Sequence, residues 1–190
     1  ADPDSLSGDA LANYLELPGG VEKRERENAA GLAADLERYD VAIDALLGTG
    51  VRGPVSGAMA EAIEALNASR APVLAVDIPS GLPADGQPPE GPCVRAASTV
   101  TMGLPKIGML IHPGVEMTGV VSVADLGFPR DLLESDSILV DALEPAEVGA
   151  MLPSRPRDGN KGTFGKALIL AGSIGMTGAA ILAARAARRS

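Results

Sequence analysis

Residues 41–81 constrain the fold more than any other stretch of the chain. They contain two apolar runs, Val41–Leu47 and Val73–Ile78, and each run carries one acid near its downstream end, Asp44 and Asp77. A glycine turn follows the first run, a Pro-Ser-Gly turn follows the second, and the segment between them has helical periodicity. This pattern predicts a strand–turn–helix–strand unit of a parallel sheet. Both carboxylates are then expected at one edge of the sheet, where open α/β sheets bind their ligands.

The rest of the chain continues this alternation. Because Val41–Leu47 is apolar on both sides of the pleat, we expect this strand to be covered on both faces. The prediction is an α/β fold, a Rossmann-like parallel sheet with helices on both faces. Further strands are expected over Ala97–Met102 and Val120–Asp125, and helices near residues 7–15, 29–38, 57–69, 107–111 and 145–152.

Composition limits the class of protein. The 190 residues carry a net charge of −9, and no apolar stretch approaches the roughly 18 residues of a membrane span. The acidic balance argues against a nucleic-acid partner, and the acidic N-terminal residues lack the pattern of a signal peptide. A single cysteine, Cys93, excludes an internal disulfide and is typical of a reducing compartment. We therefore expect a cytoplasmic protein with neither a membrane nor a nucleic-acid partner.

A change in charge divides the chain. Residues 151–190 contain seven Lys or Arg and one acid, whereas residues 1–150 contain nine bases and 24 acids. Either chance and a solvated face explain this balance, or a second unit begins in this region. We divide the chain into residues 1–142 and 143–190, and in the second piece we expect a buried strand at 166–172 followed by a helix.

The turn GTGVRGP at residues 48–54 matches the G-x-G-x-x-G fingerprint of dinucleotide-binding folds, with Asp77 a suitable distance downstream. Two details differ from the standard fingerprint: Asp44 lies inside the preceding strand, and Pro54 directly follows the third glycine. A phosphate-binding turn of backbone N–H groups fits better. The alternative is a turn that needs glycine only for a positive φ.

Asp44, Asp77 and Ser80 form a second candidate site. The two carboxylates end adjacent predicted strands, and the hydroxyl follows three residues after the second acid. Oxygen ligands of this kind suit an alkali or alkaline-earth cation and not zinc. Alternatively, one acid exchanges protons with a substrate at the sheet edge, or each acid only caps the following helix.

The segment NKGTFGKALILAGSIGMTGAA at residues 160–180 is a third candidate. It lacks the Lys-Ser/Thr ending of a P-loop, so we reject a Walker A site. Its glycine-rich turn is compatible with anion binding at a helix N-terminus, and equally with ordinary tight packing. We interpret His112 and Cys93 as loop residues without a catalytic role.

Four segments in order carry a resemblance to a known family: DALLGTGVRGP, PVLAVDIPSGLPADG, TVTMGLPKIGML and VSVADLGFP. Together they resemble the NAD(P)H-hydrate epimerase domain, the YjeF N-terminal family. The later segment LPSRPRDGNKGTFGKALILAGSIGMTGAAILAARAA resembles the opening of the ADP- or ATP-dependent NAD(P)H-hydrate dehydratase. The resemblance implies a partial epimerase domain over residues 1–142. It also implies, over residues 143–190, a linker and the first strand and helix of a ribokinase-like dehydratase domain.

The resemblance also implies an activity. Nicotinamide cofactors become hydrated at C6 of the reduced ring, and the epimerase interconverts the R and S forms of these hydrates, NADHX and NADPHX. The dehydratase then returns the S form to NAD(P)H with ADP or ATP and magnesium. The assembly is left open, with a homo-oligomer as one outcome.

Site residues follow from the matched motifs. Potassium is expected on Asp44 and Ser80. The expected catalytic residues are Asp77, which assists loss and return of the C6 hydroxyl, and Lys106, which supports the phosphate or the developing charge. The residues expected to contact the hydrate are Gly48, Thr49, Gly50, Val51, Arg52, Gly53, Pro54, Asp77 and Ala179.

The chain departs from the family at both ends. The N-N-G-G-D-G loop, which supplies a potassium ligand and phosphate contacts, is absent, as is most of the dehydratase. Asn160 also stands where the family usually has His before Lys-Gly. We therefore expect an internal fragment of a bifunctional enzyme, whose activity alone is open. Two other functions remain: an NAD(P)-dependent dehydrogenase that uses the glycine turn and Asp77, and a non-catalytic protein-binding module of the same fold.

Overall fold

The computed structural model describes residues 6–22, 29–152, 157–159, 162 and 165–189. The chain divides into two compact units, Ala1–Val140 and Asp141–Ser190. In the first unit the elements are α1 (Gly8–Leu15), α2 (Ala29–Leu36), β1 (Ala42–Asp44), α3 (Gly57–Ala68), β2 (Val73–Val76), β3 (Ser98–Met102), α4 (Ile107–Leu110), α5 (Val115–Thr118), β4 (Val120–Ala124) and α6 (Arg130–Leu133). The second unit contains α7 (Pro145–Met151) and α8 (Gly178–Arg189).

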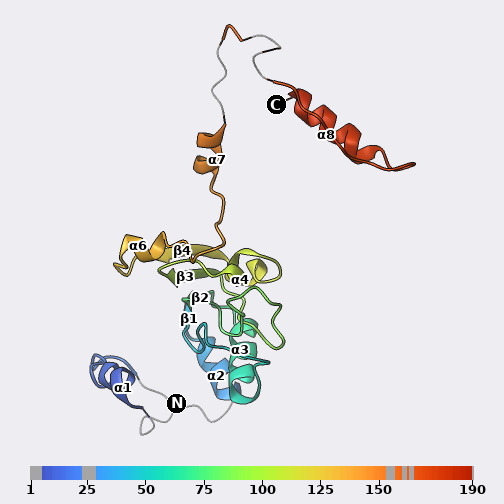
Figure 1. Ribbon diagram of the computed structural model, residues 1–190. Helices are drawn as coiled ribbons and strands as arrows, with labels where there is room; N and C mark the ends of the chain where they lie inside the picture. The colour runs from blue at the N-terminus through green and yellow to red at the C-terminus, as the bar shows by residue number, and fades with distance from the viewer. Residues whose placement is uncertain (1–5, 23–28, 153–156, 160–161, 163–164, 190) are drawn as a thin grey trace. The chain divides into compact units, whose positions relative to one another are not determined.

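The four strands form one parallel sheet in the order β1-β2-β3-β4 (Figure 1). Asp44 pairs with Ala75 of β2 in the ladder, and Val76 pairs with Val100 of β3. Because all the strands run in one direction, their carboxyl ends lie along the same edge. Asp44 ends β1 and Asp77 directly follows β2, so both acids lie at that edge. The predicted α/β class and parallel sheet are confirmed.

Two apolar clusters hold the first unit together. In one of them, Leu36 of α2 and Ile63 of α3 pack with Val73 of β2 and with other small apolar residues of the strands. The second cluster comprises Ile78, Leu82, Cys93 and Met109, and it joins the loop after β2 to α4. Alanine and valine fill much of this interior, because the chain has only two Phe, two Tyr and no Trp.

Coverage of β1 differs from the expectation. Ala42 and Asp44 are buried, but Ile43 between them is 63% exposed. The prediction that this strand is buried on both faces is therefore wrong. β1 spans only three residues and lies at the edge of the sheet beside β2. In the described part of the chain, the apolar cluster of α2 and α3 includes Ala42 but not Ile43.

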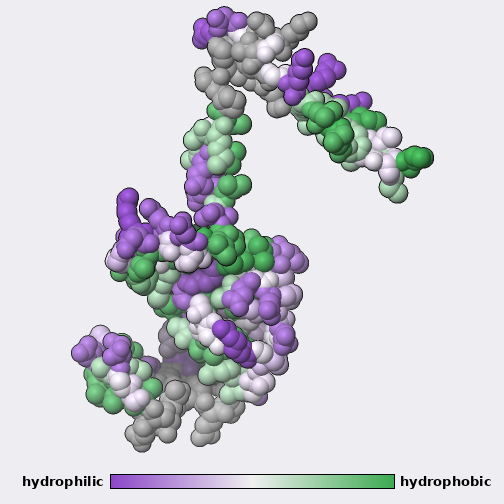
Figure 2. Space-filling view, viewed as in Figure 1, coloured by the Kyte–Doolittle hydropathy of each residue, from purple (hydrophilic) through white to green (hydrophobic). Residues whose placement is uncertain are grey.

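In the second unit, α7 and α8 are helices as predicted, but residues 166–172 form no strand. Leu168 and Leu170 in this segment are 85% and 89% exposed. A strand needs a hydrogen-bonded partner, and the described residues of this unit offer none beyond an isolated bridge between Ser173 and Met176. Figure 2 shows hydrophobic surface along α8, with hydrophilic residues near its C-terminal end. None of the described helices is long and apolar enough to cross a membrane.

Candidate functional site

Asp44 and Ser80 meet inside the protein at the carboxyl edge of the sheet. Both residues are fully buried. The Ser80 hydroxyl donates to Asp44 Oδ1 at 2.6 Å, and the Ser80 backbone N–H donates to Asp44 Oδ2 at 2.8 Å. The backbone N–H of Leu46 adds a longer bond of 3.3 Å to Oδ1. Burial of a carboxylate is costly unless hydrogen bonds or a cation compensate it, so this contact joins β1 firmly to the turn after β2.

The loop that leaves β1 is tied to the same point. Leu47 N–H donates to Ser80 Oγ at 2.9 Å, and the Leu47 carbonyl oxygen lies 3.3 Å from the same hydroxyl. Three kinds of oxygen therefore gather here, from a carboxylate, a hydroxyl and a backbone carbonyl. This donor set fits a hard cation such as potassium. Within the described residues, no group of three or more His, Cys, Asp or Glu could hold a metal ion.

Asp77 occupies an unusual backbone conformation. Its φ is +70°, and it is the only non-glycine residue with positive φ in the described part of the chain. The N–H of Ile78 bonds to the carbonyl of Val76 at 2.9 Å, which closes a three-residue γ-turn around Asp77. Such a conformation costs about 1–3 kcal/mol and is concentrated at functional sites, where the rest of the structure enforces it.

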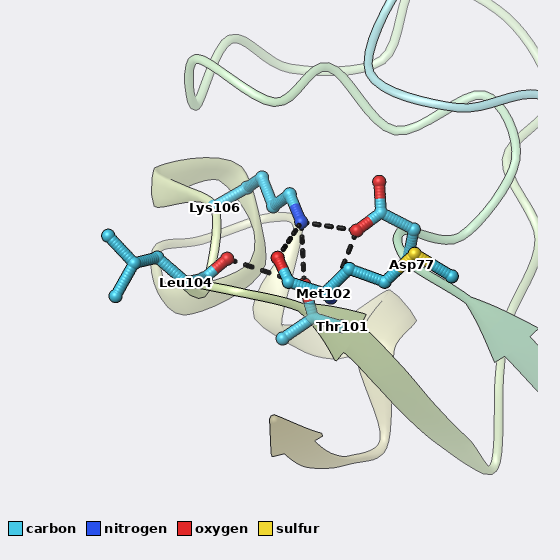
Figure 3. A network of polar contacts seen from close by, with 5 residues as sticks. All are labelled: Asp77, Thr101, Met102, Leu104 and Lys106. Carbon is cyan, nitrogen blue, oxygen red and sulfur yellow. Dashed lines mark hydrogen bonds and ion pairs between the residues drawn. The ribbon is translucent and has the colours of Figure 1, made fainter. Parts of the chain in front are cut away.

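The carboxylate of Asp77 is held at one oxygen (Figure 3). Oδ1 forms an ion pair with Lys106 Nζ and accepts the backbone N–H of Met102 at 3.1 Å. Oδ2 has no hydrogen-bond partner among the residues that the structure describes. The side chains of Asp77 and Lys106 are 23% and 18% exposed. One oxygen is thus positioned by the protein while the other remains available to a ligand.

Asp44 and Asp77 belong to different clusters of polar side chains. The sequence suggested one group of oxygens from Asp44, Asp77 and Ser80, but the hydrogen bonds of Asp77 run to β3 and Lys106 instead. Fully buried Thr101 also bonds Lys106 Nζ, at 2.9 Å, and sequence reasoning missed this residue. A signal did exist, because a threonine at an inward-facing strand position needs a partner.

The turn at residues 48–54 is a loop at the surface. Gly53 has a φ of +71°, and Nη1 of Arg52 donates to the carbonyls of Val51 and Thr49 at 2.9 and 3.4 Å. One side of the turn borders a cavity of about 270 Å³. The lining residues are Val51, Arg52, Gly53 and Val55 on one side and Gly81, Pro83, Ala84, Asp85, Gln87, Pro88, Glu90 and Gly91 on the other. The second side of the cavity belongs to the proline- and glycine-rich segment after β2, which sequence reasoning did not single out.

Ala179, the last of the expected contact residues, belongs to the second unit. It lies in the first turn of α8 and is exposed. Asn160, where the chain departs from the family pattern, lies outside the described residues.

Cys93 is buried in the apolar cluster with Ile78, Leu82 and Met109. Burial raises the pKa of its thiol to about 12, with a further rise from the Asp44 carboxylate and an opposing effect of Arg95. The side chain of Asn67 fixes this segment, because its amide donates to the Cys93 carbonyl and accepts the Arg95 N–H, both at 2.8 Å. A thiol with a raised pKa is a poor nucleophile near neutral pH, because the thiolate is the reactive form.

The titration of Cys93 gives a stability prediction. An unfolded thiol has a pKa of about 8.5, so between roughly pH 8.5 and 12 the folded protein binds more protons than the unfolded chain. The free energy of unfolding should therefore fall as the pH rises through this window. Urea unfolding across that range measures the slope, and Cys93→Ala should reduce it. Equal slopes in both proteins would show that Cys93 does not contribute.

Comparison with known proteins decides the family. The sequence profile described as "YjeF-related protein N-terminus" matches residues 2–108, which include β1, β2, β3 and Lys106. The chain belongs to this family. The resemblance drawn from the four sequence segments is thereby confirmed.

Curated relatives extend the similarity beyond that match. A bifunctional NAD(P)H-hydrate repair enzyme of Thermofilum pendens is 41% identical over 188 residues, which cover 97% of this chain and 35% of the relative. Enzymes of the same name from Moorella thermoacetica and Salinibacter ruber are 38% and 36% identical, over 100% and 99% of this chain and 37% of each relative. The chain thus spans about a third of the length of the relatives it matches.

Proposed function

We propose that this chain is part of an NAD(P)H-hydrate epimerase that acts in the cytoplasm on NADHX and NADPHX. The observation that carries this proposal is the strained Asp77, held by Lys106 at one oxygen and without a described partner at the other, in a chain that the family profile matches over residues 2–108. The names of the relatives supply the substrate class. In the whole protein we propose that epimerisation is coupled to ADP- or ATP-dependent dehydration of the S hydrate.

Epimerisation at C6 requires a proton to be transferred to the leaving C6 hydroxyl and then returned to the protein when water adds again. In our proposal Asp77 passes a proton from Oδ2 to the C6 hydroxyl as the C–O bond breaks, and water leaves, while Lys106 holds Oδ1. The lone pair of the ring nitrogen stabilises the resulting cation, and the nearby carboxylate of Asp77 favours its positive charge. Water then adds to the opposite face of C6, and Asp77 takes the proton back. No oxidant or reductant is needed.

We propose that the turn at residues 48–54 binds phosphate groups of the hydrate. This turn is exposed, and it borders the cavity through Val51, Arg52 and Gly53. Backbone N–H groups of a glycine-rich turn suit an anion, and the Arg52 guanidinium adds a positive charge. Thr49, Gly50 and Pro54 complete the same turn, as the family motif implies.

Potassium is the cation that we assign to Asp44 and Ser80, with the Leu47 carbonyl as a further oxygen. These residues fit it, because the donor set consists of hard oxygens and includes a fully buried carboxylate with no cationic partner among the described residues. When bound, the ion supplies the charge that compensates Asp44. Asp44 and Ser80 themselves fix the start of the glycine turn through Leu47.

Removal of the Ser80 hydroxyl should weaken the response to potassium. Ser80→Ala loses one oxygen ligand and the bond to Leu47 N–H, so we expect the half-saturating potassium concentration to rise about tenfold or more, equivalent to about 1.4 kcal/mol. The measurement is the epimerisation rate against potassium concentration at constant ionic strength. Ser69→Ala is the matched control, since Ser69 precedes β2 whereas Ser80 follows it. An unchanged potassium dependence in Ser80→Ala would refute the assignment.

For the dehydratase reaction we propose a role for residues 143–190 and name one residue of the site. We propose that residues 143–190 form a linker and the beginning of the dehydratase domain, with Ala179 near its substrate. ADP or ATP and magnesium would serve that reaction. The described residues contain no acid cluster suited to a divalent ion, so we assign no residue of this chain to the magnesium nucleotide.

One assay separates the proposed function from its alternatives. The whole protein that carries this sequence is incubated with mixed NADHX epimers, with and without potassium, and separately with NAD⁺ and candidate alcohols. We expect a potassium-dependent change in the epimer ratio and no hydride transfer. Hydride transfer without epimerisation would favour a dehydrogenase. Failure to bind any hydrate, together with a stable protein complex, would favour a binding module.

A further inference from the structure

Lys106 has no donor left for a substrate in this structure. A lysine ammonium carries three N–H groups. Nζ of Lys106 bonds to three protein acceptors: Oδ1 of Asp77, the hydroxyl of Thr101 at 2.9 Å and the carbonyl of Met102 at 3.1 Å (Figure 3). Lys106 therefore acts on Asp77, and of its two expected roles the support of a phosphate is disfavoured.

Thr101 contributes the one side-chain hydroxyl among these acceptors. It lies near the end of β3, on the buried face of the sheet, and is fully buried. Its Oγ1 accepts from Lys106 and lies 3.5 Å from the carbonyl of Leu104, to which it donates. The hydroxyl therefore links the strand both to the turn at residues 103–105 and to the ammonium group that follows the turn.

We propose that Thr101 is a positioning residue that fixes the Lys106 ammonium against Oδ1 of Asp77. The expected change in rate rests on the proposed epimerase function, whereas the hydrogen bond between Thr101 and Lys106 is a feature of the structure alone. A lysine side chain has many rotamers, and holding it in one of them needs several acceptors. Without the hydroxyl, the ammonium keeps two acceptors and gains freedom to leave Asp77.

The geometry of Asp77 explains why this freedom matters. Oδ1 is fixed by Lys106 and Met102, which sets the orientation of the carboxylate and leaves Oδ2 without a hydrogen-bond partner among the described residues. Displacement of reacting groups by about 1 Å can lower a rate by as much as 100-fold. The loss is expected in kcat and not in KM, because Thr101 is fully buried and, among the described residues, its hydroxyl bonds only to Lys106 and Leu104.

Thr101→Val tests the proposal, since valine has the shape of threonine but no hydroxyl. In the whole protein we expect kcat for NADHX epimerisation to fall about tenfold to 100-fold with KM nearly unchanged. Thr101→Ser, which keeps the hydroxyl, should restore most of the rate. Thr99→Val is the matched control, because Thr99 lies two residues earlier on the same buried face and donates to the Thr118 carbonyl at 2.8 Å. It should lose stability but not kcat.

Two results would overturn the proposal: equal kcat in Thr101→Val and Thr99→Val, or no rescue by Thr101→Ser. A second readout does not depend on activity. In the whole protein, the ¹⁵N signal of the Lys106 ammonium can be assigned as the lysine signal that Lys106→Arg removes. Its hydrogen exchange should be slow in the unchanged protein and faster in Thr101→Val. Equal exchange refutes the role of Thr101, whereas slow exchange without any epimerisation refutes only the proposed function.

Discussion

Asp77→Asn should lower kcat for hydrate epimerisation at least about 100-fold, the usual scale for loss of a general acid–base group. Asparagine keeps the size of the side chain but cannot carry the proton between C6 hydroxyl and protein. It also tolerates a positive φ better than most residues, so the γ-turn at Asp77 should persist. The expected phenotype is a folded protein that still binds the hydrate but no longer interconverts its epimers.

The control for this variant is Asp125→Asn. Asp125 follows β4 as Asp77 follows β2, and its carboxylate accepts the N–H of Gly127 at 2.8 Å, so it has a local structural role at the same edge of the sheet. Its replacement should leave the epimerisation rate close to that of the unchanged protein. A rate for Asp77→Asn that matches the Asp125→Asn rate would remove Asp77 from the mechanism.

Gly108→Ala should strongly lower the free energy of unfolding. Gly108 lies in α4, and a Cβ at this position would stand 2.0 Å from the Pro83 carbonyl oxygen. The obstacle is backbone, so α4 must move away from the loop, and its hydrogen bond from Gly108 N–H to the Ala84 carbonyl (2.8 Å) must break. We expect a loss of about 1–3 kcal/mol or more, the range for overpacked interiors. Thermal or urea unfolding measures it.

The same substitution should also impair the site. Lys106 is the residue immediately before α4, so a displaced helix carries its ammonium away from Asp77. Gly20→Ala is the control, because no atom lies within 4 Å of the Cβ that it would add and its φ is not positive. If Gly108→Ala unfolded at the same denaturant concentration as Gly20→Ala, the close approach of α4 to the loop would be refuted.

The sheet and its functional edge could be predicted from local sequence. The apolar runs fixed β1 and β2, and the acid at the end of each run indicated the functional edge, because parallel strands share the direction of their carboxyl ends. The residues alone placed Asp44 and Ser80 in one group with Asp77, and only the family resemblance assigned Asp44 and Ser80 to a separate cation site. Their contact follows from the adjacency of β1 and β2 and from the short turn after β2.

Other features depend on contacts that local patterns do not encode. The γ-turn at Asp77 is enforced by a bond from its own N–H to Val100 of β3 and by Lys106, which lies 29 positions later in the chain. Burial of β1 on one face only depends on its place at the edge of the sheet. The unpaired segment at residues 166–172 has strand-like composition, but composition cannot supply the neighbouring strand that a ladder requires.

We propose that this sheet edge epimerises a nicotinamide cofactor hydrate. The most direct measurement starts from the pure R epimer of NADHX and follows formation of the S epimer by chromatography or NMR. It uses the whole protein that carries this sequence, in potassium and without ADP or ATP. We predict that the epimers equilibrate much faster than in a protein-free control, that no NADH forms, and that Asp77→Asn abolishes the acceleration. Equilibration at the protein-free rate, by a folded protein that binds the hydrate, would contradict the claim.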